Sequence, residues 1–197
     1  AADHLGEPDE YSMIVGAAGG VNVNARTDPD RTLYFYSLPS HKLELWFLLE
    51  SNRFLDPVMR DFYKAKEISR EQHQFAQNNP QRRALRELLS ASYQVHPYRY
   101  PETGLPGDLD KLRRSDAEEF FRQKYSASGL IAVLIGDVNP AEARRWAEKY
   151  FGRLPKRPPR EPLKAVEPPQ ENERRSTLRI LPVSALFIGY RAVDARH

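Results

Sequence analysis

Residues 19–27 read Gly-Gly-Val-Asn-Val-Asn-Ala-Arg-Thr, and residues 31–37 read Arg-Thr-Leu-Tyr-Phe-Tyr-Ser. The two glycines allow the positive φ angles of a tight turn. The second stretch alternates small or polar side chains with large apolar ones and is rich in Thr, Tyr and Phe, which is typical of a half-buried strand. With Asp28-Pro29-Asp30 as the turn between them, we predict a β-hairpin with strands at 21–27 and 31–38.

Helix signals fill most of the chain around this hairpin. Residues 10–18 are typical of the end of a helix that Gly19-Gly20 stops. The predicted helices are 41–55 capped by Ser40, 57–77 with Pro57 in its first turn, 81–93 after Pro80, 115–125 with a Ser115–Glu118 capping box, and 139–151. Residues 94–108 are predicted as a loop. Residues 129–138 form an apolar run suited to the middle of a sheet, and 174–181 and 183–191 are further predicted strands.

This order of elements predicts an α+β fold, with a largely antiparallel sheet and helices packed on one of its faces. Residues 155–170 contain six prolines and are expected to be an extended linker. We therefore expect a first domain at 1–154, a proline-rich linker at 155–171 and the first strands of a second domain at 172–197.

Composition limits the classes of function. The chain has 197 residues, no cysteine and a net charge of +3 from 30 basic and 27 acidic side chains. Disulfides and cysteine chemistry are therefore excluded. No apolar run approaches the roughly 20 residues of a membrane span, and residues 1–7 lack the features of a signal peptide. We therefore expect no membrane as partner. The arginine pairs lie on predicted helices with acids nearby, so we expect no nucleic acid as partner either.

Several motifs follow the hairpin in a fixed order. They are Glu71 in a long helix, Asn78-Asn79-Pro80, His96-Pro97-Tyr98, Gly136-Asp137-Val138 and residues 150–155, Tyr-Phe-Gly-Arg-Leu-Pro. From about Glu10 to Tyr190, this set resembles the M16 metallopeptidases, the family of pitrilysin, insulysin and the mitochondrial processing peptidase. The resemblance implies the same α+β fold, occurring as repeated, similarly folded domains or subunits.

The resemblance also implies a catalytic zinc. The family takes two histidines from one helical turn, spaced His-x-x-Glu-His, with the glutamate as general base and a later helical glutamate as third ligand. Histidines four apart lie on one helix face and reach one ion. None of the five histidines here is four residues from another, and Pro8 stands where a motif beginning at His4 needs its second histidine. We therefore assign no catalytic residue and expect the zinc-binding helix to lie before residue 1.

The third zinc ligand has a candidate in this chain. Glu71, followed by Asn78-Asn79-Pro80, fits the family pattern. Counting forward from residues 62–64 instead places Gln72 there, a neutral and poor ligand. Lys64 and Ala65 stand where an acidic residue often precedes the ligand. The alternative is that Glu71 is a solvated helix carboxylate.

The other histidines have structural interpretations. His73 lies off the helix face of Glu71 and is expected to be exposed. His96 is expected to be a packing element, and His41 is expected to lie on the surface.

The strand at 21–27 carries a second functional prediction. An edge strand exposes amides and carbonyls that pair with an added peptide strand. The resemblance implies that Asn24, Ala25, Arg26 and Thr27 hold the substrate backbone in this way, with Arg26 favouring acidic or polar side chains. An ordinary hairpin strand is the alternative.

The leading hypothesis is a fragment of a zinc metalloendopeptidase that hydrolyses extended peptides, inactive in the form given by this sequence. Its partners are a peptide or protein substrate and a second M16-like domain or subunit. The alternative is a non-catalytic M16-like subunit with a binding or assembly role, and the third class is a basic nucleic-acid-binding module. A periplasmic or secreted location is slightly favoured over a cytoplasmic one.

Overall fold

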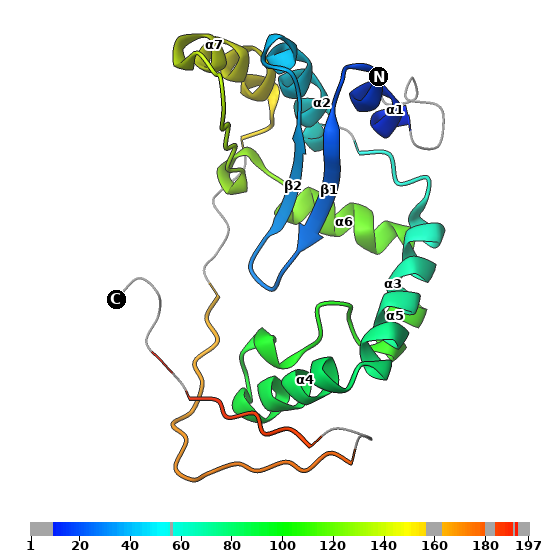
Figure 1. Ribbon diagram of the computed structural model, residues 1–197, viewed down its shortest axis with the longest axis vertical. Helices are drawn as coiled ribbons and strands as arrows, with labels where there is room; N and C mark the ends of the chain where they lie inside the picture. The colour runs from blue at the N-terminus through cyan, green and yellow to red at the C-terminus, as the bar shows by residue number, and fades with distance from the viewer. Residues whose placement is uncertain (1–9, 56, 157–162, 180–183, 191, 193–197) are drawn as a thin grey trace. The chain divides into compact units, whose positions relative to one another are not determined.

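The computed structural model describes residues 10–55, 57–156, 163–179, 184–190 and 192 (Figure 1). It divides into two compact units, one of residues 1–60 with 113–161 and the other of residues 61–112 with 162–197. The predicted strand pair at the C-terminus falls partly outside the described residues. The domain division at 154 and 172 stays a prediction.

The first unit is built around the predicted hairpin. Helix α1 (Glu10–Ala17) is followed by a turn at Gly19, whose φ is +82°. Strands β1 (Val21–Thr27) and β2 (Thr32–Ser37) then pair antiparallel (Figure 1). The Gly20 N–H donates to the Val15 carbonyl at 2.8 Å. A Cβ on Gly20 would lie only 2.7 Å from that carbonyl oxygen, so the close approach of α1 and β1 requires glycine there.

The helices of this unit are α2 (Leu43–Leu55), α6 (Arg114–Lys124) and α7 (Pro140–Tyr150), with 3₁₀ turns η2 (Ser40–Lys42), η4 (Ala127–Gly129) and η5 (Phe151–Arg153). Helix α2 packs against α7 and η5. The buried Phe47 ring lies 5.4 Å from Phe151 between ring centroids, and Trp46 contacts both. These aromatic contacts form part of the core of the first unit, together with the buried Val15, Leu49 and Leu154.

Helices cover one face of the hairpin. Tyr34 and Tyr36 alternate with exposed residues along β2 and are half-buried. Tyr36 meets Tyr11 of α1 edge to face, and Arg53 of α2 lies over the Tyr34 ring. Leu33 and Phe35, on the opposite face, are exposed. The predicted α+β class with helices on one face of an antiparallel sheet is confirmed.

The predicted strand at 129–138 is wrong. Residues 127–129 form η4, and residues 130–135 belong to no ladder in the described part of the chain. Ile131 and Ile135 are 86% and 93% exposed. A strand needs a neighbour to receive its main-chain hydrogen bonds, and no described strand lies beside this run.

The second unit contains α3 (Phe62–Asn78), α4 (Pro80–Ser92), η3 (Pro97–Arg99) and α5 (Pro106–Lys111). Asn79 caps α4, because its Oδ1 accepts the Arg82 N–H at 2.9 Å and Pro80 takes the first helical position. Helix α4 begins within one residue of its predicted start. Helix α5 begins inside the predicted loop and extends three residues beyond it, and its buried Leu109 explains why it forms there.

Three local predictions need correction. Residues 57–59 are irregular and α3 begins at Phe62, so Pro57 does not open a helix. The N-terminus of helix α6 is capped through Asp116, whose Oδ2 accepts the Arg113 N–H at 2.8 Å. Glu118 forms an ion pair with Arg114 instead of a capping box with Ser115. The described parts of 174–181 and 183–191 form no ladder and are irregular.

Candidate peptide-binding edge and metal-ligand carboxylate

The register of the hairpin decides which β1 amides face outward. The Asp28 N–H donates to the Arg31 carbonyl at 2.9 Å, which makes residues 28 and 31 a hydrogen-bonded pair. Hydrogen-bonded and non-bonded pairs alternate along an antiparallel ladder. The pairs Ala25–Tyr34 and Thr27–Thr32 are therefore non-bonded, so the Ala25 and Thr27 amides point away from β2.

Side-chain distances support this register. The Thr27 and Thr32 hydroxyl oxygens lie 3.2 Å apart, as expected where non-bonded pairs bring their side chains close. At the other end, the ladder is irregular between Val21 and Asn24, and Asn22 has a φ of +58°. The regular outer edge of β1 therefore runs from Asn24 to the turn, which is the stretch that the sequence predicts to bind substrate.

Every residue of β1 is exposed. Because paired residues project to the same side, Asn24 and Arg26 share the uncovered face with Phe35 and Leu33, their partners in β2. A peptide added to this edge would meet the Arg26 guanidinium and two exposed apolar side chains on that face.

The turn that closes this edge is held by Asp28. Its carboxylate accepts from the Arg31 Nε at 3.0 Å and from the Asp30 and Arg31 amides at 3.1 and 3.0 Å. The Arg31 side-chain hydrogen bond and then the Asp30 amide lower the pKa of Asp28. The carboxylate is fully ionised at neutral pH and keeps the turn closed.

The covered face of the hairpin is anchored by an arginine between two tyrosines. The Arg53 guanidinium carbon lies 4.5 Å from the ring centroids of both Tyr11 and Tyr34. Its Nε donates to the Glu50 Oε2 at 3.0 Å, and the Tyr11 hydroxyl donates to the Glu50 Oε1 at 2.6 Å. Glu50 is only 6% exposed, so these two donors compensate its carboxylate oxygens for the loss of contact with water.

This environment raises the pKa values of the two tyrosines. Burial, followed by the hydrogen bond to Glu50, raises the pKa of Tyr11 to about 12. Burial and the 2.9 Å contact between the Tyr34 and Tyr125 hydroxyls raise the pKa of Tyr34. These tyrosines remain neutral at physiological pH, and they position the hairpin without titrating.

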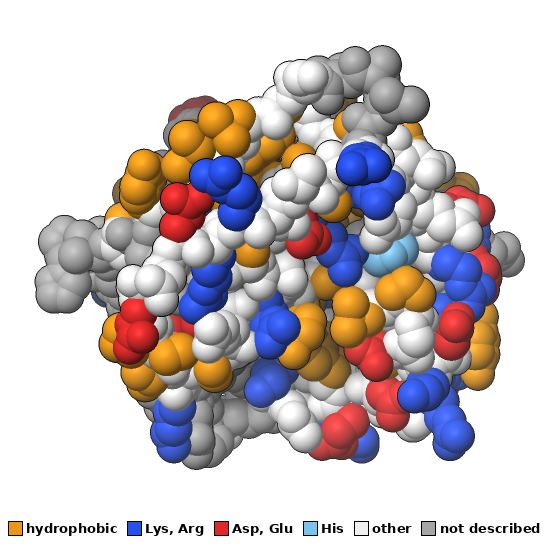
Figure 2. Space-filling view, turned by 90° about the horizontal axis from the view of Figure 1, so that it is seen from below, with side chains coloured by type: hydrophobic (Ala, Val, Ile, Leu, Met, Phe, Trp, Pro, Cys, Tyr) orange, Lys and Arg blue, Asp and Glu red, His pale blue; other side chains and the backbone are white. Residues whose placement is uncertain are grey.

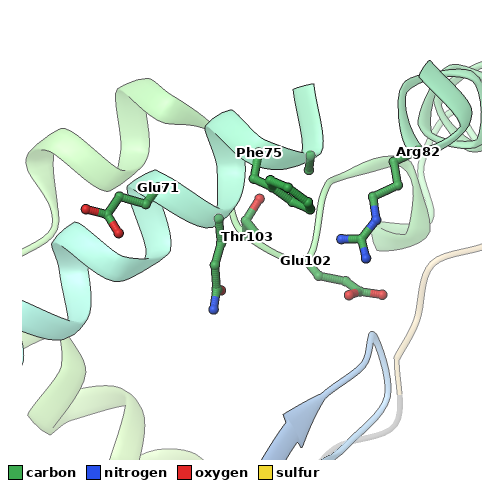
Figure 3. A pocket seen from close by; sticks show the side chains of 7 residues that line it. Glu71, Phe75, Arg82, Glu102 and Thr103 are labelled. Atoms are coloured by element: carbon green, nitrogen blue, oxygen red, sulfur yellow. The ribbon is translucent and has the colours of Figure 1, made fainter. Parts of the chain in front are cut away.

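Glu71, the predicted metal ligand, lies on α3 in the second unit. It lines an open hollow of about 430 Å³ together with Gln72, Phe75, Ala76, Arg82, Glu102 and Thr103. Figure 3 shows its carboxylate directed away from Phe75 and Arg82. Glu71 is exposed and has no hydrogen-bonded or ionic partner among the described residues.

The described residues do not form a zinc site by themselves. Across the described ranges, no three His, Cys, Asp or Glu side chains come together in a group that could hold a metal ion. A catalytic zinc takes three protein ligands, so one carboxylate is insufficient. The predicted role of Glu71, and the alternative placing of the ligand at Gln72, stay predictions.

His73 corrects a prediction. It is 6% exposed, not solvated, because its Nδ1 lies 3.0 Å from the Thr103 Oγ1 and its Nε2 lies 3.3 Å from the Gln77 Nε2. Thr103 belongs to the loop before α5, thirty residues further along the chain. The position of His73 on its own helix therefore does not predict this contact. His96 packs against Tyr93 and Tyr98, which confirms its structural interpretation, and His41 is exposed as expected.

A carboxylate that sequence reasoning missed lies in the proline-rich segment. Glu167 accepts hydrogen bonds from three consecutive amides, those of Gln94, Val95 and His96, the first at 2.9 Å and the second at 2.5 Å. Arg174 donates to the Ala91 carbonyl at 2.8 Å. Glu167 and Arg174 therefore bind this segment to the C-terminal end of α4 and the residues that follow it. No local sequence pattern predicts this contact.

Charges of both signs are mixed on the surface. Figure 2 shows Lys and Arg side chains interspersed with Asp and Glu over the face it presents. As expected from the arginine pairs, Arg114 binds Glu118 at 2.7 Å and Arg145 binds Glu142 at 3.2 Å. None of the described helices combines the length and the apolar character that a membrane crossing requires.

Solved structures place the fold in a class. A protease from Helicobacter pylori superposes with a TM-score of 0.73 at 22% identity, over 82% of this chain and 40% of that one. A ferredoxin protease mutant, solved in complex with Arabidopsis ferredoxin, superposes with a TM-score of 0.64 at 23% identity, over 74% of this chain and 17% of that one. The fold is protease-like.

Sequence comparisons find similarity to M16 peptidases. Residues 111–197 match the domain described as the Peptidase M16 inactive domain. An insulin-degrading enzyme homolog of Dictyostelium discoideum is 25% identical over 163 residues, 76% of this chain and 16% of that protein. The mitochondrial-processing peptidase subunit beta of Blastocladiella emersonii is 27% identical over 141 residues, 69% of this chain and 30% of that protein. The resemblance to the M16 peptidases is confirmed, and the chain spans less than a third of either relative.

Proposed function

We propose that this chain is part of an M16-type zinc metalloendopeptidase and that the outer edge of β1 holds an extended peptide substrate by strand addition. The observation that carries the proposal is the exposed edge from Asn24 to Thr27, with the Ala25 and Thr27 amides directed outward. Main-chain pairing gives affinity to such a complex, and neighbouring side chains give preference. The aromatic and ionic contacts of the covered face hold the edge in place.

The zinc belongs to the proposal for the complete protein. Glu71 would supply one oxygen ligand, and two histidines in the family's spacing would have to come from residues that this sequence does not contain. A zinc ion held in this way would supply Lewis-acid chemistry for peptide hydrolysis. The chain by itself is proposed to lack peptidase activity, because its sequence does not contain the His-x-x-Glu-His spacing and a catalytic zinc takes three protein ligands.

The substrate preference follows from the open face of the hairpin. Arg26 is exposed and has no ionic partner among the described residues. We propose that an acidic or polar side chain of an extended peptide lies beside it. The relatives and neighbours include a processing peptidase subunit and a protease in complex with ferredoxin, which supports a protein or peptide substrate.

A binding assay tests this function. A fluorescent, extended peptide with alternating acidic residues is titrated with the chain and followed by anisotropy, with or without zinc. We expect binding that zinc does not change, and no cleavage product. The matched control is the same peptide with N-methyl groups on its alternate amides, which removes the donors for strand pairing. Equal binding of both peptides would contradict strand addition, and cleavage with stoichiometric zinc binding would contradict the inactivity of the chain alone.

A non-catalytic M16-like subunit is the second candidate. It is favoured by the match of residues 111–197 to the inactive domain and by Lys64, Ala65 and Gln72 at positions where the family pattern expects other residues. In that case the edge or the surrounding surface serves assembly with a second M16-like domain or subunit. Gene sequence upstream of residue 1 distinguishes the candidates, because an intact His-x-x-Glu-His supports the enzyme and its loss supports the subunit.

A further inference from the structure

We infer that the Asn24 side chain blocks the β1 edge against an incoming strand and must rotate away before a peptide pairs with Ala25. The Asn24 Oδ1 accepts the Ala25 N–H at 2.8 Å. This inference rests on the proposed function only for its consequence in peptide binding. The blocking contact itself is a property of the hairpin.

The blocked amide is one of only two on the regular edge that can donate outward. The ladder register directs the Ala25 and Thr27 amides away from β2, while the irregularity between Val21 and Asn24 ends the regular edge on the other side. An added strand therefore finds half of these outward donors already occupied.

The contact is local and exposed, which makes it reversible. Asn24 and Ala25 are adjacent, and both are exposed, so rotation of the Asn24 side chain needs no change in the packed face of the hairpin. The freed amide can then donate to a peptide carbonyl. A peptide that supplies only one carbonyl replaces one hydrogen bond of Ala25 by another and gains little binding free energy. A peptide that pairs along the whole edge displaces Asn24 as part of a continuous ladder.

The same contact has a protective consequence. Unpaired strand edges are templates for association with other chains, and proteins shield them with side chains, charges or bulges. Asn24 shields one outward amide of β1, and the irregular backbone at Asn22 interrupts the edge beside it. The edge is therefore selective for extended ligands long enough to compete with the shield.

Three variants of the full chain separate the roles of Asn24. Asn24→Leu keeps the size of the side chain and removes the acceptor, Asn24→Ala removes both, and Asn24→Asp keeps an acceptor oxygen. Amide hydrogen exchange measured by NMR reports the Ala25 N–H directly. We expect Ala25 to exchange several-fold faster in the Leu and Ala variants than in the wild type or the Asp variant, while Thr27 stays unchanged in all of them.

Peptide affinity is then measured by anisotropy with an uncharged, extended peptide, so that the charge of the Asp variant has little influence. Loss of a competing hydrogen bond is expected to tighten binding about two- to tenfold in the Leu and Ala variants. Unchanged Ala25 exchange in those variants, or weaker peptide binding by them, would overturn the inference. Faster Ala25 exchange without peptide binding by any variant would uphold the block and contradict the proposed function instead.

Discussion

The β1–β2 hairpin and residues 130–135, Leu-Ile-Ala-Val-Leu-Ile, are both rich in strand-forming side chains, but their structures differ. The hairpin has a closed turn, a ladder and one face covered by helices. Residues 130–135 have no ladder in the described structure and expose Ile131 and Ile135. A hairpin supplies its own strand partner within a few residues, whereas a central strand depends on neighbours that are distant in sequence.

This difference bears on function. Both regions offer unpaired main-chain groups to an extended peptide, but only the hairpin is held in a fixed orientation by packing. A binding edge that is already ordered loses less conformational entropy when a ligand pairs with it. Peptide binding by β1 stays our proposal, and the following predictions test how far the order of the hairpin depends on its packing contacts.

The largest expected effect is at the junction of α1 and β1. Gly20→Ala would place a Cβ 2.7 Å from the Val15 carbonyl oxygen and 2.3 Å from the Val15 Cγ1. We expect a loss of about 2–4 kcal/mol in the free energy of unfolding, measured by urea denaturation. The matched control is Gly16→Ala in α1, where a Cβ meets nothing within 4 Å, and it should be neutral or stabilising. Equal effects of the two substitutions would contradict the close packing of hairpin and helix.

The next effect is at Arg53, which fastens β2 to α1 and α2. Arg53→Ala removes two ring contacts and leaves Glu50, 6% exposed, without its cationic partner. We expect a loss of about 2–3 kcal/mol in the free energy of unfolding, because an unpaired buried charge is costly. Arg122→Ala is the control, since it breaks an exposed pair with Glu119 and should have a much smaller effect than Arg53→Ala. A loss at Arg53 no larger than that of the control would show that the arginine does not anchor the hairpin.

A smaller effect concerns alkaline pH. The pKa of Tyr11 is raised to about 12 in the folded chain, while an unfolded tyrosine titrates near its ordinary pKa of about 10. The unfolded chain therefore loses this proton first, so the contribution of Tyr11 is complete below pH 10 and is lost as the pH rises toward 12. We expect the free energy of unfolding to fall between pH 10 and 12, and less steeply in Tyr11→Phe. If the free energy of unfolding fell equally steeply with pH in the wild type and in Tyr11→Phe, the raised pKa of Tyr11 would be contradicted.

The smallest effect is expected in residues 130–135. Ile131→Thr combined with Ile135→Thr replaces two side chains that are 86% and 93% exposed. The free energy of unfolding should change by less than about 0.5 kcal/mol. Phe47→Leu, at a position 2% exposed in the core, is the control and should cost about 1 kcal/mol or more. A large loss in the double variant would show that this run is a packed strand, which would remove the contrast with the hairpin.

The sequence predicts those parts of the fold whose signals are local. The hairpin follows from its glycines, its turn and the alternation along β2, and α7 follows from Asn139, whose Oδ1 accepts the Ala141 and Glu142 amides at 2.9 and 3.2 Å. Helix α5 and the burial of His73 were not predicted, because each depends on contacts between α3 and the loop that follows η3. The strand predicted at 129–138 fails because pairing is a property of two strands and not of one.

The candidate site also has features that could be predicted from the sequence and features that could not. The exposure of β1 could be predicted from its polar composition, but the contact between Asn24 and Ala25 could not, because it depends on one side-chain rotamer. The predicted metal role of Glu71 came from a family pattern. Within the described residues its neighbours do not add metal ligands, since a metal centre needs donors from several elements brought together.

Contacts between protons of a bound extended peptide and those of the isotope-labelled chain, observed as nuclear Overhauser effects, test the central claim most directly. We predict cross-strand contacts from the peptide Hα protons to Ala25 and its neighbours on β1, with the Thr27 amide protected from exchange. Cross-strand contacts to residues 130–135, with the β1 amides unaffected, would contradict the account.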